Sequence, residues 1–143
     1  MIVAFCGHRE LFDPPAVKAW LGQVVAAMIE EGEEEFWFGD KGAFDQAALR
    51  AVSEKKNALP HLRRTLVKAY LNQAYDPEKF DDTMYPPLEN APYRLAMVRR
   101  NEYMAMKCDV LVTYAIHNQG NAMRIREFAR RKGKRVINYP DLP

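Results

Sequence analysis

Cysteine is scarce in this sequence, and no hydrophobic run is long. Its two cysteines, Cys6 and Cys108, lie inside apolar segments and lack the Cys-x-x-Cys spacing of zinc sites. This argues against a disulfide framework or a metal site and favours buried, reduced thiols. No segment approaches the roughly 20 apolar residues that cross a membrane, and residues 2–6 are too short for the apolar part of a signal peptide. We therefore expect a cytoplasmic protein with no membrane contact, no metal ion and no cofactor.

A large excess of one charge is absent as well. The chain has 21 Lys and Arg against 19 Asp and Glu, a net charge of +2 at pH 7. This near balance argues against polyanion binding as the main activity. The C-terminal part is nevertheless basic, through Arg124, Arg126, Arg130, Arg131, Lys132, Lys134 and Arg135. Because most such charge is solvated helix surface, nucleic-acid binding through this segment is a less favoured alternative.

The sequence does contain a regular alternation of strand-like and helix-like segments. Its 143 residues, 48% of them hydrophobic, fit one domain with a core on both faces of a sheet. Apolar runs predict strands at 2–6, 35–38, within 63–70, 109–114 and 135–139, and helical spacing predicts helices at about 14–31, 43–56, 93–107 and 122–132. This order indicates an α/β fold, a Rossmann-like doubly wound parallel sheet of about five strands in a single domain spanning 1–143.

Residues 71–92 do not fit this alternation. The segment holds Pro77, Pro86, Pro87 and Pro92 among the aromatic residues Tyr75, Phe80 and Tyr85. Loops of this length are uncommon in compact domains and usually functional. Two interpretations remain open: a surface excursion pinned by its own aromatic side chains, or a lid or dimer contact.

Three polar turns that contain glycine follow predicted strands. They are Gly7-His8-Arg9, Gly39-Asp40-Lys41-Gly42 with Asp45 in the next helical turn, and His117-Asn118-Gln119-Gly120-Asn121. Ligands of open parallel sheets bind outside the carboxyl ends of the strands. Glycine lets the backbone approach a ligand, and the N–H groups of a helix start attract phosphate. The agreement of the three turns predicts one nucleotide-sized site, rimmed by Gly7, Gly39 and Gly120.

Several of these polar residues have more than one reasonable role. Arg9 either binds phosphate or carboxylate through its guanidinium fork or forms a salt bridge across the turn. His8 is either an acid, base or phosphate donor, or an ordinary hydrogen-bonded histidine at a strand end. Asp45 either binds ribose hydroxyls or stabilises its helix N-terminus. The predicted ligand-binding set also contains Asp40, Gly42, His117 and Asn121.

Two segments carry a resemblance to a known family. Met97-Val98-Arg99-Arg100-Asn101-Glu102-Tyr103-Met104, followed by Cys108-Asp109-Val110-Leu111-Val112, resembles the Lonely Guy family of nucleotide-processing phosphoribohydrolases. Phe5-Cys6-Gly7-His8-Arg9, residues 39–45 and the last helix look like the wider SLOG superfamily, which includes DNA processing protein A. Within it, the small YpsA-like bacterial proteins are the most similar. The resemblance implies a Rossmann-like fold and, because its members are commonly dimers, a homo-oligomer.

The resemblance also implies candidate catalytic residues. Phosphoribohydrolases use an arginine of this helix and a glutamate after a Gly-Gly-x-Gly-Thr loop to cleave the base from ribose 5′-monophosphate, and the matching positions are Arg100 and Glu127. A carboxylate suits the oxocarbenium-like state of such a cleavage. The alternative is a structural ion pair between these two residues. The loop itself departs from the pattern, because residues 115–121 contain fewer glycines, with Gly120 alone, and Ile125 stands at the position of the threonine. Fewer phosphate donors favour binding over catalysis.

Three functions are compatible with these sequence features. The leading one is binding of a nucleotide or nucleotide-derived small molecule, as a sensor or sequestering protein. The second is hydrolysis of an N-glycosidic bond, which alone requires both Arg100 and Glu127 to face the ligand. The third is a single-stranded DNA or protein-partner module, for which DNA affinity would be salt-sensitive.

Overall fold

A parallel β-sheet forms the centre of the computed structural model, which describes residues 1–39 and 42–143. In the described part of the chain the strands are β1 (Ile2–Gly7), β2 (Glu35–Phe38), β3 (Arg63–Val67), β4 (Asp82–Met84), β5 (Val110–Tyr114) and β6 (Arg135–Asn138). The helices are α1 (Pro14–Glu30), α2 (Ala43–Lys56), the 3-10 turn η1 (Tyr93–Leu95), α3 (Ala96–Lys107) and α4 (Asn121–Arg131). The predicted Rossmann-like α/β architecture is confirmed.

The strand order is β4-β3-β2-β1-β5-β6, and every neighbouring pair is parallel. The chain runs outward from β1 to β4 on one side and then returns to add β5 and β6 on the other. The order therefore reverses between β1 and β5, which is the switch point where open α/β sheets bind ligands. The prediction that residues 2–6, 36–38 and 109–114 form neighbouring parallel strands is confirmed, since β1 pairs with both β2 and β5.

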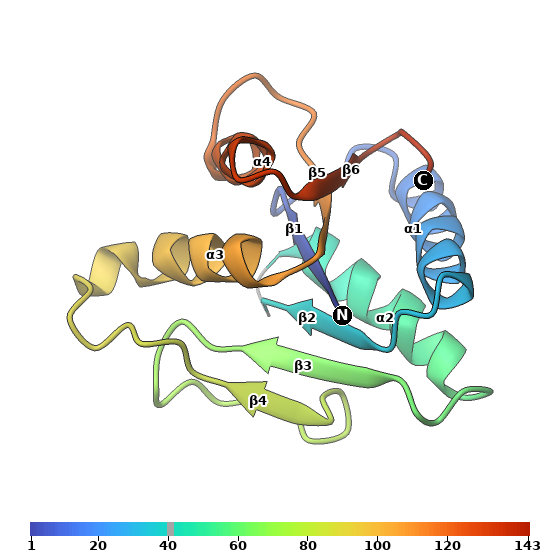
Figure 1. Cartoon of the computed structure of the whole chain (residues 1–143), viewed down its shortest axis with the longest axis horizontal. Helices are drawn as coiled ribbons and strands as arrows, with labels where there is room; N and C mark the ends of the chain where they lie inside the picture. Colours follow the sequence, from blue (N-terminus) through green and yellow to red (C-terminus); the bar gives the residue numbers. More distant parts are fainter. Residues whose placement is uncertain (40–41) are drawn as a thin grey trace.

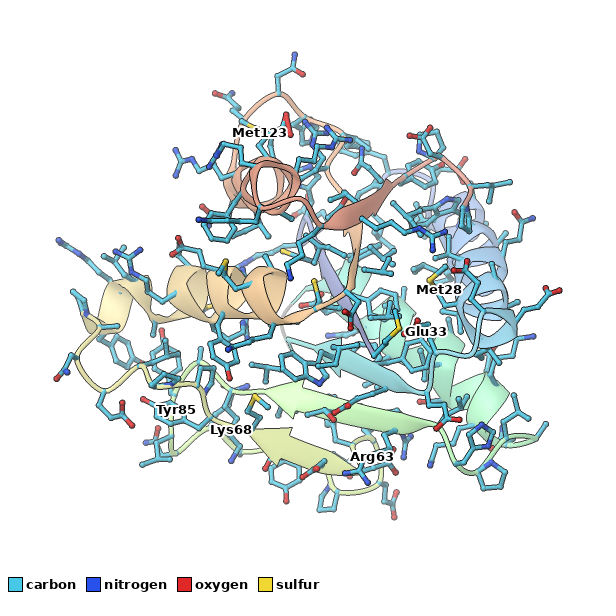
Figure 2. All side chains as sticks on the ribbon, in the orientation of Figure 1. Met28, Glu33, Arg63, Lys68, Tyr85 and Met123 are labelled. Carbon is cyan, nitrogen blue, oxygen red and sulfur yellow. The ribbon has the colours of Figure 1, made fainter. Side chains whose placement is uncertain are left out.

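Helices cover both faces of the sheet. Helices α1 and α2 pack on one face, and α3 and α4 pack on the other (Figure 1). Helix α1 begins with Asp13 as its N-cap and with prolines in its first turn, where the missing N–H has no cost. Its buried stripe includes Val17, Leu21, Val24 and Met28, and Met28 lies among the side chains between this helix and the sheet (Figure 2).

The two faces have different cores. The α1–α2 side, which we call the aromatic side, buries Phe5, Phe36, Phe38, Phe44 and Tyr114. Phe5 stacks on Phe38 with ring centroids 5.1 Å apart. The α3–α4 side, which we call the small-residue side, buries Ala4, Cys6, Ala105, Cys108 and Ala129, together with the larger Trp37 and Met104. Successive residues of a strand point to opposite faces, so β1 supplies Phe5 to one core and Ala4 and Cys6 to the other.

One strand was not predicted. The sequence predicted about five strands and a long loop at 71–92, whereas β4 lies inside that segment as an edge strand paired with β3. Phe80 is 7% exposed and belongs to the aromatic core, while Tyr75 is 44% exposed. Of the aromatic residues expected to anchor the segment to the domain, Phe80 is thus buried in the core. A lid or interface role for the rest of the segment stays a prediction.

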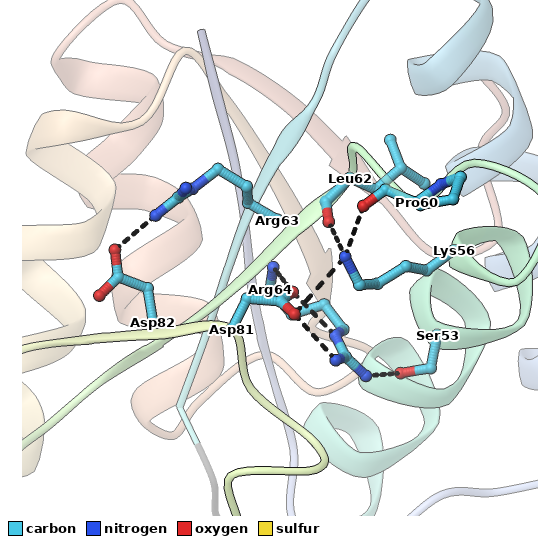
Figure 3. Close-up of polar contacts among 8 residues, drawn as sticks. All are labelled: Ser53, Lys56, Pro60, Leu62, Arg63, Arg64, Asp81 and Asp82. Carbon is cyan, nitrogen blue, oxygen red and sulfur yellow. Dashed lines mark hydrogen bonds and ion pairs between the residues drawn. The ribbon is translucent and has the colours of Figure 1, made fainter.

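Ion pairs hold this edge of the sheet (Figure 3). The Arg63 guanidinium lies 2.6 Å from Asp82, and Arg64 pairs with Asp81 at 3.0 Å. Lys56 Nζ donates to the carbonyls of Pro60 and Leu62 and lies 3.5 Å from Asp81. Burial alone would raise the pKa of Asp81, but hydrogen bonds from Arg64 and the charges of Arg64 and Lys56 outweigh it and lower the pKa. The segment before β4 is therefore tied to the end of α2.

No helix within residues 1–39 and 42–143 combines the length and the hydrophobicity needed to span a membrane.

Candidate functional site

A cavity of about 360 Å³ lies at the carboxyl end of β1, between α3 and α4. Its described lining comes from the end of β1 (Cys6, Gly7, His8, Arg9), α2 (Asp45), η1 and α3 (Arg94, Met97, Val98, Arg100, Asn101) and α4 (Asn121, Ala122). We call it the switch-point cavity, because it opens where the strand order reverses.

The described lining of the switch-point cavity is positively charged. It contains Arg9, Arg94 and Arg100 against one carboxylate, Asp45. Arg100 is only 2% exposed, and its guanidinium donates to the carbonyl of Val67 at 3.0 Å and to Asn101 Oδ1 at 2.8 Å. A buried guanidinium is costly unless it is hydrogen-bonded, so these two acceptors hold Arg100 in place at the wall of the cavity.

The N-terminus of α4 also faces this cavity. Gly120, at φ 103°, precedes the helix and provides no side-chain cap, and the first turn contains no acidic residue. The first residues, Asn121 and Ala122, line the cavity. The N–H groups of a helix start and the positive end of its dipole attract anions, so α4 adds to the positive potential of the arginines.

The other two helix starts are less suited to an anion. Helix α1 begins at Pro14 and Pro15, which have no N–H, and Asp13 accepts a hydrogen bond from Ala16 N at 3.5 Å. Helix α2 has Asp45 in its first turn. The sequence predicts three equivalent turns, whereas in the structure the start of α4 is the best suited of the three to attract an anion.

His8 joins the end of β1 to the segment after β5. Its Nε2 accepts a hydrogen bond from Ile116 N at 3.1 Å, and its ring centroid lies 4.7 Å from that of His117. Burial lowers the pKa of His8, and the charge of His117 lowers it further. The hydrogen bond from an amide requires an unprotonated Nε2, which agrees with this direction. A neutral, structural His8 therefore positions the loop that leads into α4.

Two glycines bring the β2–α2 turn into contact with the arginines. A Cβ on Gly39 would lie 2.9 Å from the Arg100 guanidinium carbon, and one on Gly42 would lie 2.9 Å from Arg9 Cα. Gly42 also has φ +88°, a conformation that glycine adopts without strain. Gly42 is therefore the position where a side chain would be strained and would meet the Arg9 backbone, whereas a side chain at Gly39 would have to displace the Arg100 guanidinium.

Most of the predicted ligand-binding residues meet at this edge of the sheet. Gly7, His8, Arg9, Asp45 and Asn121 line the switch-point cavity. Gly39 lines an adjoining cavity, Gly42 contacts Arg9, Gly120 precedes α4, and His117 packs on His8. Asp40 lies outside the described residues. Their role in binding stays a prediction.

The structure does not bring the two candidate catalytic residues together at the cavity. Arg100 lines it, whereas Glu127 lies outside its described lining and pairs with Arg130 at 3.2 Å and with Arg126 at 3.7 Å. The interpretation of Arg100 and Glu127 as a structural ion pair is therefore wrong. Arg100 instead uses the Val67 carbonyl and Asn101.

Sequence reasoning missed one wall of the cavity. Arg94, Met97, Val98 and Asn101 line it from η1 and α3. Their spacing of three, four and seven residues places them on one helical face, and this signal could have identified them. Cys6 also lines the cavity, but burial raises the pKa of its thiol to about 12, so it stays protonated and is a poor nucleophile.

No protein-family model matches the sequence, and no curated protein matches it. Among solved structures, DNA processing protein A from Streptococcus pneumoniae superposes with a TM-score of 0.67 at 19% identity, over 97% of this chain and 50% of that one. A structure concerned with single-stranded DNA binding by DNA processing protein A from Helicobacter pylori gives 0.67 at 17% identity, over 99% of this chain and 66% of that one. The molybdenum cofactor carrier protein from Chlamydomonas reinhardtii gives 0.65 at 12% identity, over 96% and 74% of the two chains.

These likenesses show the fold. The chain has the same Rossmann-like α/β fold as these three proteins. It spans about half the length of the pneumococcal protein and about two thirds of the Helicobacter protein.

Proposed function

We propose that this protein binds a phosphorylated nucleotide or nucleotide-derived small molecule in the switch-point cavity. The observation that carries the proposal is the convergence of three arginines and the uncapped N-terminus of α4 on one cavity of about 360 Å³. Ligand pockets commonly measure roughly 300–1,000 Å³, so the cavity accommodates a sugar phosphate.

The chemistry of the lining favours phosphate. Guanidinium groups bind phosphate oxygens in pairs, and Arg9 is exposed at the mouth of the cavity, where it can reach such a group. The helix start adds backbone donors that are directed along the helix axis. Asp45, from the first turn of α2, is the described carboxylate that can accept hydrogen bonds from ribose hydroxyls.

Binding without efficient hydrolysis is the function that this geometry favours. Glu127, the glutamate that the family resemblance assigns to catalysis, pairs with Arg126 and Arg130 rather than lining the cavity. Loss of one preorganised group lowers an enzymatic rate by roughly a hundredfold or more. We therefore expect nucleoside monophosphates to bind and to be cleaved only slowly.

Isothermal titration calorimetry with ribose 5-phosphate and nucleoside monophosphates tests this proposal. We expect Arg9→Ala to weaken binding by about tenfold or more, because it removes a charge-assisted contact worth roughly 1.5–3 kcal/mol. Arg99→Ala is the matched control, since Arg99 is exposed on α3 and pairs with Glu102 at 2.9 Å. Equal losses in the two variants, or no binding by the wild-type protein, would overturn the proposal. Rapid release of free base that Glu127→Gln abolishes would favour the hydrolase instead.

Single-stranded nucleic acid is a second candidate, favoured by the surface of α4. Arg124, Arg130 and Arg131 are exposed on this helix, and the fold is shared with a protein described as binding single-stranded DNA. Phosphate contacts of this kind release counterions, so affinity falls steeply with salt. Fluorescence anisotropy of a labelled oligonucleotide at several salt concentrations would show such a decline in affinity. The Arg130→Ala, Arg131→Ala double variant would bind the oligonucleotide more weakly and with a smaller dependence on salt.

A further inference from the structure

A second cavity adjoins the switch-point cavity. It measures about 290 Å³, and its described lining includes Gly39, Asp45, Leu49, Tyr75 and Phe80. It lies between α2 and the segment that joins β3 to β4. Asp45 lines both cavities, and Gly39 of the second cavity lies directly against Arg100 of the first. The two cavities therefore meet at Asp45.

The second cavity has a different chemical character from the first. Its described lining contains no arginine but two aromatic rings, Tyr75 and Phe80, beside Leu49. Phe80 is fixed in the core, 6.3 Å from Phe38, and Tyr75 carries Lys68 Nζ over its ring at 5.1 Å. The cavity thus provides an apolar, aromatic wall rather than an anion site.

Polar groups stand beside this aromatic wall. Asp76 and Lys79 line the same cavity, and Asp76 Oδ1 accepts a hydrogen bond from Glu78 N at 2.9 Å, which orients the carboxylate. The carboxylate can accept from a ring N–H or an exocyclic amine, and the ammonium of Lys79 can donate to a ring nitrogen or carbonyl. An aromatic wall with one acceptor group and one donor group suits a planar heteroaromatic ring.

We propose that the second cavity binds the base of a nucleotide whose phosphate occupies the switch-point cavity. This inference rests on the proposed function and names the part of the ligand that function leaves open. The volumes support it, because pockets for whole small-molecule ligands measure roughly 300–1,000 Å³. Each cavity, at about 360 and 290 Å³, is near the lower limit of that range, and the two together fall well within it.

Calorimetric titration of the wild-type protein with ribose 5-phosphate and with the four common nucleoside 5′-monophosphates tests the inference. We expect at least one monophosphate to bind about tenfold or more tightly than ribose 5-phosphate, as expected for a stacked base. Tyr75→Ala should remove most of this gain and leave the affinity for ribose 5-phosphate unchanged. Ala74→Trp, at an exposed position that lines the second cavity, should do the same by filling it.

Tyr93→Ala is the matched control. Tyr93 is 78% exposed and stacks on Tyr70, with ring centroids 4.4 Å apart, but is not part of the described lining of either cavity. It should leave all affinities unchanged, and thermal melts should show all three variants folded. If the monophosphates bind no more tightly than ribose 5-phosphate, or if only Tyr93→Ala weakens them, the inference is overturned while the proposed function stands. If no phosphorylated compound binds, both fail.

Discussion

The two sides of the sheet use the same strands for different purposes. On the aromatic side, Phe5 and Phe38 of the sheet and Phe44 of α2 are almost completely buried among α1, α2 and the strands. On the small-residue side the strand contributes the smaller Ala4 and Cys6, the charged Arg100 is buried, and a cavity of about 360 Å³ opens. We infer that the first side provides most of the stability and that the second is less tightly packed where it forms the switch-point cavity.

Truncating an aromatic core residue should have the largest effect. Phe44 is fully buried and stacks on Tyr114, with ring centroids 5.8 Å apart. Phe44→Ala should lower the free energy of unfolding by about 3–5 kcal/mol, measured by urea denaturation. Met97→Ala, at a half-buried position of the switch-point cavity, should cost only about 1 kcal/mol or less. Equal costs would contradict the division between a packed side and a binding side.

Arg100→Met should weaken ligand binding and change stability little, the opposite of the effect expected for Phe44→Ala. The methionine keeps an apolar stem but removes the guanidinium, so the affinity for ribose 5-phosphate should fall by about tenfold or more. Stability should change by only about 1 kcal/mol, because a well-packed apolar group often replaces a buried charge at little cost. Calorimetry and urea denaturation of the same variant separate the two effects. A large loss of stability with unchanged affinity would make Arg100 a purely structural residue.

Gly7 joins the two sides, and its substitution should have an intermediate effect on stability. A Cβ there would lie 2.5 Å from Phe44 Cδ2 and 2.9 Å from Tyr114 Cβ. Overpacking of this kind costs about 1–3 kcal/mol, so Gly7→Ala should lower the urea midpoint. Gly22→Ala in the middle of α1 is the control, because a Cβ at Gly22 would meet no atom within 4 Å. It should stabilise the protein by about 0.5–1 kcal/mol, and a loss of stability there would contradict the comparison.

The smallest effect concerns pH and His8. The pKa of His8 in the folded protein is lowered from the ordinary histidine value of about 6.5, whereas the unfolded chain takes up the proton near that value. Stability should therefore be fully present above about pH 6.5 and should fall as the pH drops toward the folded pKa. His8→Gln should flatten this decline in thermal melts without phosphate. His61→Gln, an exposed control residue 3.9 Å from Glu34, should leave it unchanged. An identical decline in the wild-type protein and His8→Gln would exclude His8 as its source.

Much of the fold could be predicted because its signals are local. The helix at 43–56 was predicted with the bounds of α2, and the apolar runs located β1, β2 and β5 to within a residue or so. Strand β4 could not be predicted, because its three residues are too few to show an alternating hydrophobic pattern. It exists through pairing with β3 and through ion pairs from Arg63 and Arg64, which are long-range contacts.

The site could be located only in part. Gly7, Arg9, Asp45 and Asn121 could be predicted to lie near one another, because each follows a strand of a parallel sheet and the carboxyl ends of such strands meet at one edge. The helical spacing of Arg94, Met97, Val98 and Asn101 is a local signal for the wall formed by α3, but it does not say which face of the helix meets the cavity. The contact of His8 with the loop after β5 joins segments far apart in the chain, and no local pattern encodes it.

An amide ¹H–¹⁵N NMR titration with ribose 5-phosphate tests the division of the molecule most directly. If the small-residue side holds the site, the signals of Gly7, Arg9, Asn121 and Ala122 should shift in a saturable manner, while those of residues 18–29 in α1 should not move. Saturable shifts confined to α1 and the outer surface of α2, with the signals around Gly7 and Asn121 unchanged, would contradict the proposal.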